Sequence, residues 1–173
     1  MLFTLGHSVR PQEATRALLE AQGIALLVDV RAFPRSRRNP QYNSAALAAA
    51  LQAIGIAYRH MPELGGMRKP QPGSVNLGLR EGGFRGFADY MQTPEFDAAL
   101  AQLIGLSEEK RVAIMCAEAK PKDCHRSLIS DALSARGVEV RHIMDAGHIE
   151  PHALRPTAEV HAGRVSYPFS LEG

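Results

Sequence analysis

Short, wholly apolar runs alternate along the chain with longer stretches whose apolar residues recur at helical spacing. Residues 24–28 (Ile-Ala-Leu-Leu-Val) show no polar alternation, which is typical of a parallel strand buried on both faces of a sheet. The preceding stretch, 11–22, begins with Pro11 and is followed by Gly23, the pattern of an amphipathic helix. The alternation predicts an α/β fold with a single domain and three layers, in which helices cover both faces of a mainly parallel sheet.

The predicted elements follow one another along the whole chain. Strands are expected at 2–5, 24–28, 56–60, 111–116 and 138–143, and helices at 11–22, 44–54, 84–91, 94–104 and 127–136. Residues 63–86 hold many glycines, prolines and basic residues, which predicts a long functional or mobile loop. We expect one domain over 1–173, with the His- and Pro-rich tail, 145–173, wrapping its surface.

Composition limits the classes of protein that remain. The chain has 173 residues, of which 45% are hydrophobic and 22% charged, as in ordinary globular proteins. No apolar run approaches the roughly 18 residues of a membrane-spanning helix, and the N-terminus lacks the features of a signal peptide. Two cysteines do not make a disulfide scaffold. We therefore expect a cytoplasmic protein with no membrane partner.

Ionisable or nucleophilic residues follow every predicted strand. Ligands of open parallel sheets bind beyond the carboxyl ends of the strands, so these residues are candidates for one site. They are His7 and Ser8, Asp29 and Arg31, Glu63, Cys116 and Glu118, then Cys124, His125 and Arg126 farther along the same loop. We expect His7, Asp29, Glu63, Cys116, Glu118 and Arg126 to line one cleft.

A basic segment follows the second predicted strand and contains Arg31, Arg35, Arg37 and Arg38, with Phe33 and Tyr42 nearby. Guanidinium groups bind phosphate in a bidentate manner, and aromatic rings stack on bases. The position of these arginines at a strand end favours an anion site over a solvated loop. The formal net charge of +2 is too small to argue for nucleic acid by itself. Asp29 and Arg31 form either a structural ion pair or part of the site.

The two cysteines are predicted to differ in reactivity. Cys124 is expected at the entry of a helix, where the helix dipole and the cations of Lys120, Lys122 and Arg126 would lower its pKa. Cys116, at the end of a buried strand, is expected to be an inert thiol. Thiol phosphatases and sulfurtransferases need an arginine after five intervening residues, but Lys122 stands there.

A metal site is not expected. Residues of ligand type are present in His7, Cys116, Glu118, Cys124 and His125, but their spacing matches no zinc motif. We predict no metal and no cofactor.

Four motifs together resemble one protein family. They are Thr-Leu-Gly-His-Ser-Val-Arg at 4–10, Leu-Val-Asp-Val-Arg-Ala-Phe-Pro-Arg-Ser at 27–36, His-Met-Pro-Glu-Leu-Gly-Gly at 60–66, and Cys-Ala-Glu at 116–118 followed by Cys-His-Arg at 124–126. The chain is similar over nearly its whole length to the DUF488 family, although Val9 replaces a residue that is often polar there. The resemblance implies a compact α/β fold with a motif-lined site. It implies no reaction, because the family is named as a domain of unknown function.

The residues favour a small enzyme that acts on a phosphate-bearing substrate, a nucleotide or a nucleic acid. In this hypothesis Arg31, Arg35 and Arg126 hold the anion, Glu118 or His7 moves protons, and Cys124 is a candidate nucleophile. Ser8, Asp29, Glu63, Cys116 and His125 are further candidates for substrate binding. One alternative is a non-catalytic module that binds nucleic acid or a nucleotide, and another is a redox sensor that joins Cys116 and Cys124. The sequence decides neither between these nor on the oligomeric state.

Overall fold

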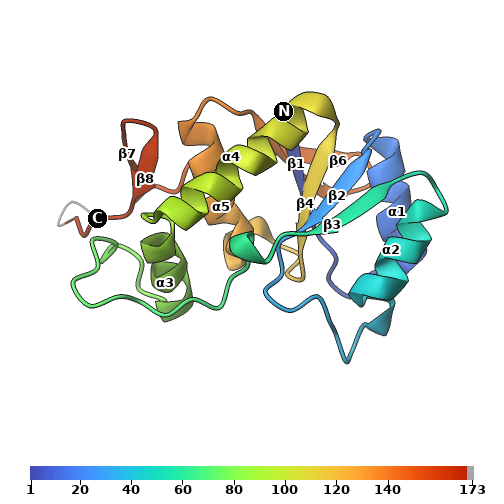
Figure 1. Cartoon of the computed structure of the whole chain (residues 1–173), viewed down its shortest axis with the longest axis horizontal. Coiled ribbons are helices and arrows are strands. Elements are labelled where there is room, and N and C mark those ends of the chain that lie inside the picture. The colour runs from blue at the N-terminus through green and yellow to red at the C-terminus, as the bar shows by residue number, and fades with distance from the viewer. Residues whose placement is uncertain (171–173) are drawn as a thin grey trace.

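A six-stranded sheet forms the centre of the molecule (Figure 1). The structure is a computed structural model that describes residues 1–170. In sheet order the strands are β3 (Ala57–His60), β2 (Leu26–Asp29), β4 (Val112–Cys116), β1 (Leu2–Gly6), β5 (Val140–Asp145) and β6 (His148–Pro151). The first five are parallel and β6 is antiparallel to β5. The carboxyl ends of five strands therefore meet at one edge of the sheet.

Helices cover both faces of this sheet, as predicted (Figure 1). On one face lie α1 (Gln12–Ala21) and α2 (Ser44–Gln52), and on the other lie α3 (Gly82–Tyr90), α4 (Pro94–Glu109) and α5 (Arg126–Ala135). Strand β4 shows why two cores form, because successive side chains of a strand point to opposite faces. Ala113 and Met115 pack in the core beneath α1 and α2, whereas Ile114 and Cys116 face the core beneath α3–α5.

Short 3-10 turns shape three of the loops that leave the carboxyl edge. They are η1 (Pro40–Tyr42) after β2, η2 (Pro62–Leu64) after β3 and η3 (Pro121–Asp123) after β4. Each begins with a proline, whose fixed φ suits the first position of a helical turn. These turns give the loops around the carboxyl edge a defined course.

The segment predicted as a long loop is held by one buried carboxylate. Apart from η2 and the start of α3, residues 63–86 form neither helix nor strand. Asp89 of α3 accepts hydrogen bonds from the backbone N–H of Gln71 at 2.8 Å, the Ser74 hydroxyl at 2.6 Å and the Asn76 side-chain amide at 2.7 Å. The irregular segment is therefore fixed to the core.

The C-terminal tail differs from the expectation that it only wraps the surface. Strand β6 extends the sheet, and β7 (Glu159–His161) pairs with β8 (Arg164–Ser166) as a separate hairpin. Tyr167 is fully buried and donates a hydrogen bond to Asp131 at 2.7 Å. Residues 171–173 of the tail lie outside the described residues. Within 1–170, every helix is too short or too polar to cross a membrane.

Candidate functional site

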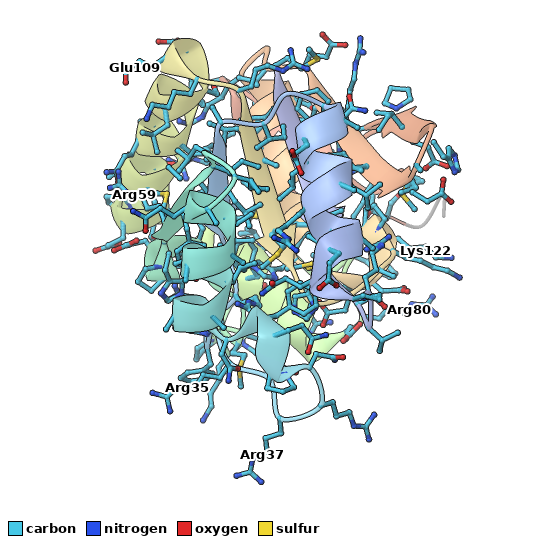
Figure 2. All side chains as sticks on the ribbon, turned by 90° about the vertical axis from the view of Figure 1, so that its right-hand side faces the viewer. Arg35, Arg37, Arg59, Arg80, Glu109 and Lys122 are labelled. Carbon is cyan, nitrogen blue, oxygen red and sulfur yellow. The ribbon has the colours of Figure 1, made fainter. Side chains whose placement is uncertain are left out.

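A cavity of about 680 Å³ lies at the carboxyl edge of the sheet. Its walls come from segments that are far apart in the sequence: 7–9 after β1, 31–39 after β2, 66–67 and 81–84 near the start of α3, and 116–125 after β4. Figure 2 shows Arg35 and Arg37 projecting from the loop after β2 at one end of the molecule. The cavity thus lies where the sequence places the site.

Cys116 lies against a fully buried arginine. The Nη1 atom of Arg126, the first residue of α5, donates a hydrogen bond to Cys116 Sγ at 2.6 Å. The guanidinium also donates to the carbonyls of Glu118 and Ala119 and to the hydroxyl of Thr4. Among residues 1–170 no carboxylate pairs with Arg126, so Cys116 Sγ is the ionisable atom in contact with it. A buried cation requires a counter-charge, which favours Cys116 as a thiolate.

The electrostatics of the two thiols reverse the prediction from the sequence. Burial opposes ionisation of Cys116, but the hydrogen bond from Cys124 and the charge of Arg126 outweigh it, and the pKa of Cys116 is lowered. Burial and the hydrogen bond to Cys116 raise the pKa of Cys124 well above its ordinary value. The prediction of Cys124 as the acidic thiol and Cys116 as the inert one is therefore wrong.

The two thiols differ from the prediction because of where the charged side chains around them extend. At the entry of α5, the backbone nitrogen of Arg126 donates a hydrogen bond to Cys124 Sγ at 3.4 Å. The guanidinium of the same residue extends past it to Cys116. Lys120 and Lys122 are exposed, and Lys122 points outward in Figure 2.

Three ligand-type side chains gather at the base of the cavity. Cys116, Glu118 and Cys124 each offer one atom, and these atoms lie within 4.8 Å of one another. Thiolates and a carboxylate are ligands that Zn²⁺ accepts. The guanidinium of Arg126 donates a hydrogen bond to Cys116 Sγ. Its positive charge repels a metal cation, and its hydrogen bond uses the sulfur that would bind one. The cluster therefore suits an arginine-stabilised nucleophile better than a metal ion.

Asp29 and Arg31 form a buried ion pair. Arg31 donates through Nε and Nη2 to the two carboxylate oxygens of Asp29, at 2.9 and 2.7 Å, and Tyr58 donates to the same carboxylate at 2.6 Å. Nη2 of Arg31 also donates to the carbonyl of Tyr42. Asp29 is fully buried and does not line the cavity, whereas Arg31 does. Asp29 thus fixes the orientation of Arg31.

His7 is a neutral imidazole with both nitrogens engaged. Its Nδ1 lies 2.8 Å from the carbonyl of Ser8 and therefore carries the hydrogen, so Nε2 accepts from Nη1 of Arg31 at 3.3 Å. The ring stacks on Tyr42 with centroids 4.1 Å apart. Burial lowers the pKa of His7. Glu118, which is exposed and lines the cavity, is better placed to transfer protons.

Two arginines that line the cavity have free guanidinium groups. Arg35 and Arg38 are exposed and line the cavity, and neither side chain has a hydrogen-bond or ion-pair partner among residues 1–170. Their loop is braced by Asn43, which accepts from the Ser36 N–H at 2.7 Å. Arg37, from the same loop, does not line the cavity. The sequence had indicated Arg38 only as part of the basic segment.

The other predicted site residues are only partly brought together. Ser8 lines the cavity at a φ of 50°, a strained left-handed conformation, and its N–H donates to the carbonyl of Ala117. His125 lines it too, and its Nε2 donates to the carbonyls of Val30 and Leu64. Glu63 is exposed and outside the cavity, and Arg126 lies directly behind Cys116. The expected six-residue cleft is wrong for Asp29, Glu63 and Arg126.

Behind Arg126 lies a buried hydrogen-bond chain that the sequence did not reveal. Thr4 accepts from Arg126 Nε at 3.2 Å, and its hydroxyl lies 2.5 Å from His142 Nδ1. His142 Nε2 lies 2.8 Å from His152 Nδ1, and His152 Nε2 donates to Asp131 at 2.7 Å. Burial, together with the neighbouring His152 and Arg126, lowers the pKa of His142 to about 3. Side chains alone thus connect Arg126 to Asp131.

Comparison with known proteins identifies one relationship. Residues 10–133 match the model of a protein family described as "Domain of unknown function DUF488". Neither a curated protein nor a solved structure matches the chain.

Proposed function

Since the chain belongs to the DUF488 family, whose description states no function, we propose from its own site that it is an enzyme acting on a phosphate-bearing substrate. One observation carries the proposal: a thiol paired with a buried guanidinium lines the same cavity as two unpartnered arginines. In this proposal Cys116 is the nucleophile, Glu118 transfers protons, and Arg35 and Arg38 bind the phosphate. A reducing compartment such as the cytoplasm would keep both thiols free.

The cavity favours a small molecule over an extended polyanion. Its volume of about 680 Å³ lies within the usual range of small-molecule sites. Arg35 and Arg38 line the cavity together with Glu81, Glu118 and Asp123, whose carboxylates would repel a second anionic group. A substrate with one phosphate end, such as a nucleotide, suits this mixture of charges.

Protection from alkylation tests the phosphate site. We expect AMP to slow the labelling of Cys116 by iodoacetamide, because a ligand held by Arg35 and Arg38 would cover the cavity. Adenosine should protect much less. Replacing both Arg35 and Arg38 by Ala should weaken the protection by AMP by about tenfold or more, since hydrogen bonds to charged groups contribute about 1.5–3 kcal/mol each. The measurement is the labelling rate against AMP concentration, resolved by peptide mass spectrometry.

Arg37→Ala provides the matched control, because this arginine leaves the same loop but does not line the cavity. AMP should protect Cys116 from alkylation as strongly in this variant as in the wild type. Equal protection by adenosine and AMP, or full protection in the double variant, would contradict the proposed phosphate site.

A nucleic-acid-binding module is the second candidate. The observation in its favour is Phe33, which is 68% exposed in the basic loop and could stack on a base. If this function is correct, replacing Arg35, Arg37 and Arg38 by Ala should flatten the salt dependence of binding to single-stranded oligonucleotides. Each lost phosphate contact lowers the slope of log affinity against log salt by roughly 0.7. An unchanged slope would exclude this loop as a polyanion site.

A further inference from the structure

The two thiols of the cavity are close enough to react with each other. Cys116 and Cys124 stand at opposite ends of one loop, both line the cavity, and their Sγ atoms lie within 4.8 Å. The side chains of residues 117–120 between them are exposed. The two sulfurs are close enough to influence each other's ionisation.

A base stands beside the second thiol. Because Nε2 of His125 donates to the carbonyls of Val30 and Leu64, at 2.8 and 3.0 Å, its Nδ1 carries the free lone pair. This Nδ1 lies 3.6 Å from Cys124 Sγ. Burial lowers the pKa of His125, so the ring is neutral and its Nδ1 lone pair is not protonated. The arrangement supplies a nucleophile in Cys116, a second thiol in Cys124, and a proton acceptor for that thiol.

We propose that Cys116 is an oxidation site for hydroperoxides and that Cys124 resolves the oxidised sulfur into a disulfide. The Cys116 thiolate attacks one peroxide oxygen and the O–O bond breaks. The leaving oxygen takes a proton from solvent and departs as water or an alcohol, and Cys116 becomes a sulfenic acid, oxidised by two electrons. Cys124 then passes its proton to His125 Nδ1 and attacks Cys116 Sγ. The S–O bond breaks, and the hydroxide takes the proton from His125 and leaves as water.

The inference extends the proposed function to regulation of the same site. It rests on the thiolate of Cys116, which that function also uses, but not on the phosphate site. A disulfide would remove the proposed nucleophile, and an external thiol would restore it by exchange. Activity at Cys116 would then depend on the redox state of the compartment.

Intact-mass measurement after treatment with hydrogen peroxide tests the pair. The wild type should lose two hydrogen atoms, give a peptide that links Cys116 to Cys124, and regain both thiols with dithiothreitol. Cys124→Ser should stop at a sulfenic acid on Cys116 that dimedone traps. Cys116→Ser should keep its remaining thiol. If the wild type keeps both thiols free while an exposed model thiol is oxidised, or if Cys124→Ser yields no sulfenic acid, the proposal is wrong.

His125→Gln separates the second step from the first. A glutamine amide can still donate to the carbonyls that His125 contacts, but it offers no base to Cys124. We expect sulfenic acid to form at the wild-type rate and disulfide formation to slow by about a hundredfold. His148→Gln, an exposed histidine, is the control and should change neither step. An unchanged rate of disulfide formation in His125→Gln would overturn the role of His125.

The oxidation assay and the protection assay can fail separately. Oxidation is followed without any anion, whereas protection by AMP is measured on the reduced protein. Absence of the disulfide with AMP protection intact would overturn the oxidation site and leave the proposed function standing. Absence of AMP protection with the disulfide intact would overturn the proposed function and leave the oxidation site standing.

Discussion

Arg126→Met is expected to slow the alkylation of Cys116 near neutral pH by about tenfold or more, since each unit of pKa changes the thiolate fraction tenfold. The substitution removes the guanidinium that lies 2.6 Å from Cys116 Sγ. It also leaves the carbonyls of Glu118 and Ala119 without their donor. Breaking a buried ion pair from one side costs about 3–5 kcal/mol, so the free energy of unfolding should fall by that amount. Iodoacetamide labelling against pH and urea denaturation measure the two effects.

The loss of stability in Arg126→Met should depend on pH. In the folded protein the pKa of Cys116 lies below its unfolded value, so its pairing with Arg126 stabilises the fold fully above the unfolded pKa of about 8.5. This contribution is lost as the pH falls through the folded-state pKa. The difference in unfolding free energy between wild type and variant should therefore shrink towards acid pH. A difference that is constant with pH would contradict a thiolate at Cys116.

Arg136→Met is the matched control at the other end of the same helix. Arg136 pairs with Asp97 at 3.1 Å, and both side chains are partly exposed. Such pairs contribute at most about 1 kcal/mol to the free energy of unfolding. Because Arg136 pairs with Asp97 and not with Cys116, its loss should leave the alkylation profile of Cys116 unchanged.

Gly6→Ala should produce the other large effect. A Cβ at Gly6, the last residue of β1, would lie 1.7 Å from the carbonyl oxygen of Glu118 and 2.7 Å from Nη1 of Arg126. The loops after β1 and β4 are held together here by backbone hydrogen bonds from His7 and Ser8. Forcing them apart should lower the unfolding free energy by about 3 kcal/mol or more, as measured in urea.

Gly105→Ala is the control for this substitution. Gly105 lies inside α4 with no neighbouring atom within 4 Å of an added Cβ, so alanine should be neutral or stabilise by up to about 1 kcal/mol. Equal stability of Gly6→Ala and the wild type would show that the two loops can separate freely.

Local pattern predicts the sheet and the edge at which the cavity lies because both follow from short-range rules. The all-apolar run before Asp29 identifies a buried parallel strand, and Thr93 caps α4 by accepting from the N–H of Phe96. Local pattern does not predict the tail, because His148–Pro151 is an exposed edge strand with no apolar alternation. Its place in the sheet depends on β5, a contact that periodicity does not encode.

The chemistry at the site could not be predicted from neighbours in the sequence. Arg126 is two residues from Cys124, yet the long guanidinium stem carries its charge to Cys116. His7 has the right residue type for a general base, but Arg31 already occupies its free nitrogen. Both contacts depend on how far a side chain extends in the folded protein.

The hydrogen-bond chain from Arg126 to Asp131 connects the guanidinium beside Cys116 to the far end of the polypeptide. His142 and His152 both lie beyond residue 133, where the match to the family model stops. A chain cut before His152 would leave His142 Nε2 without its partner. A segment remote from the cavity therefore supplies part of the buried scaffold behind the arginine that contacts Cys116.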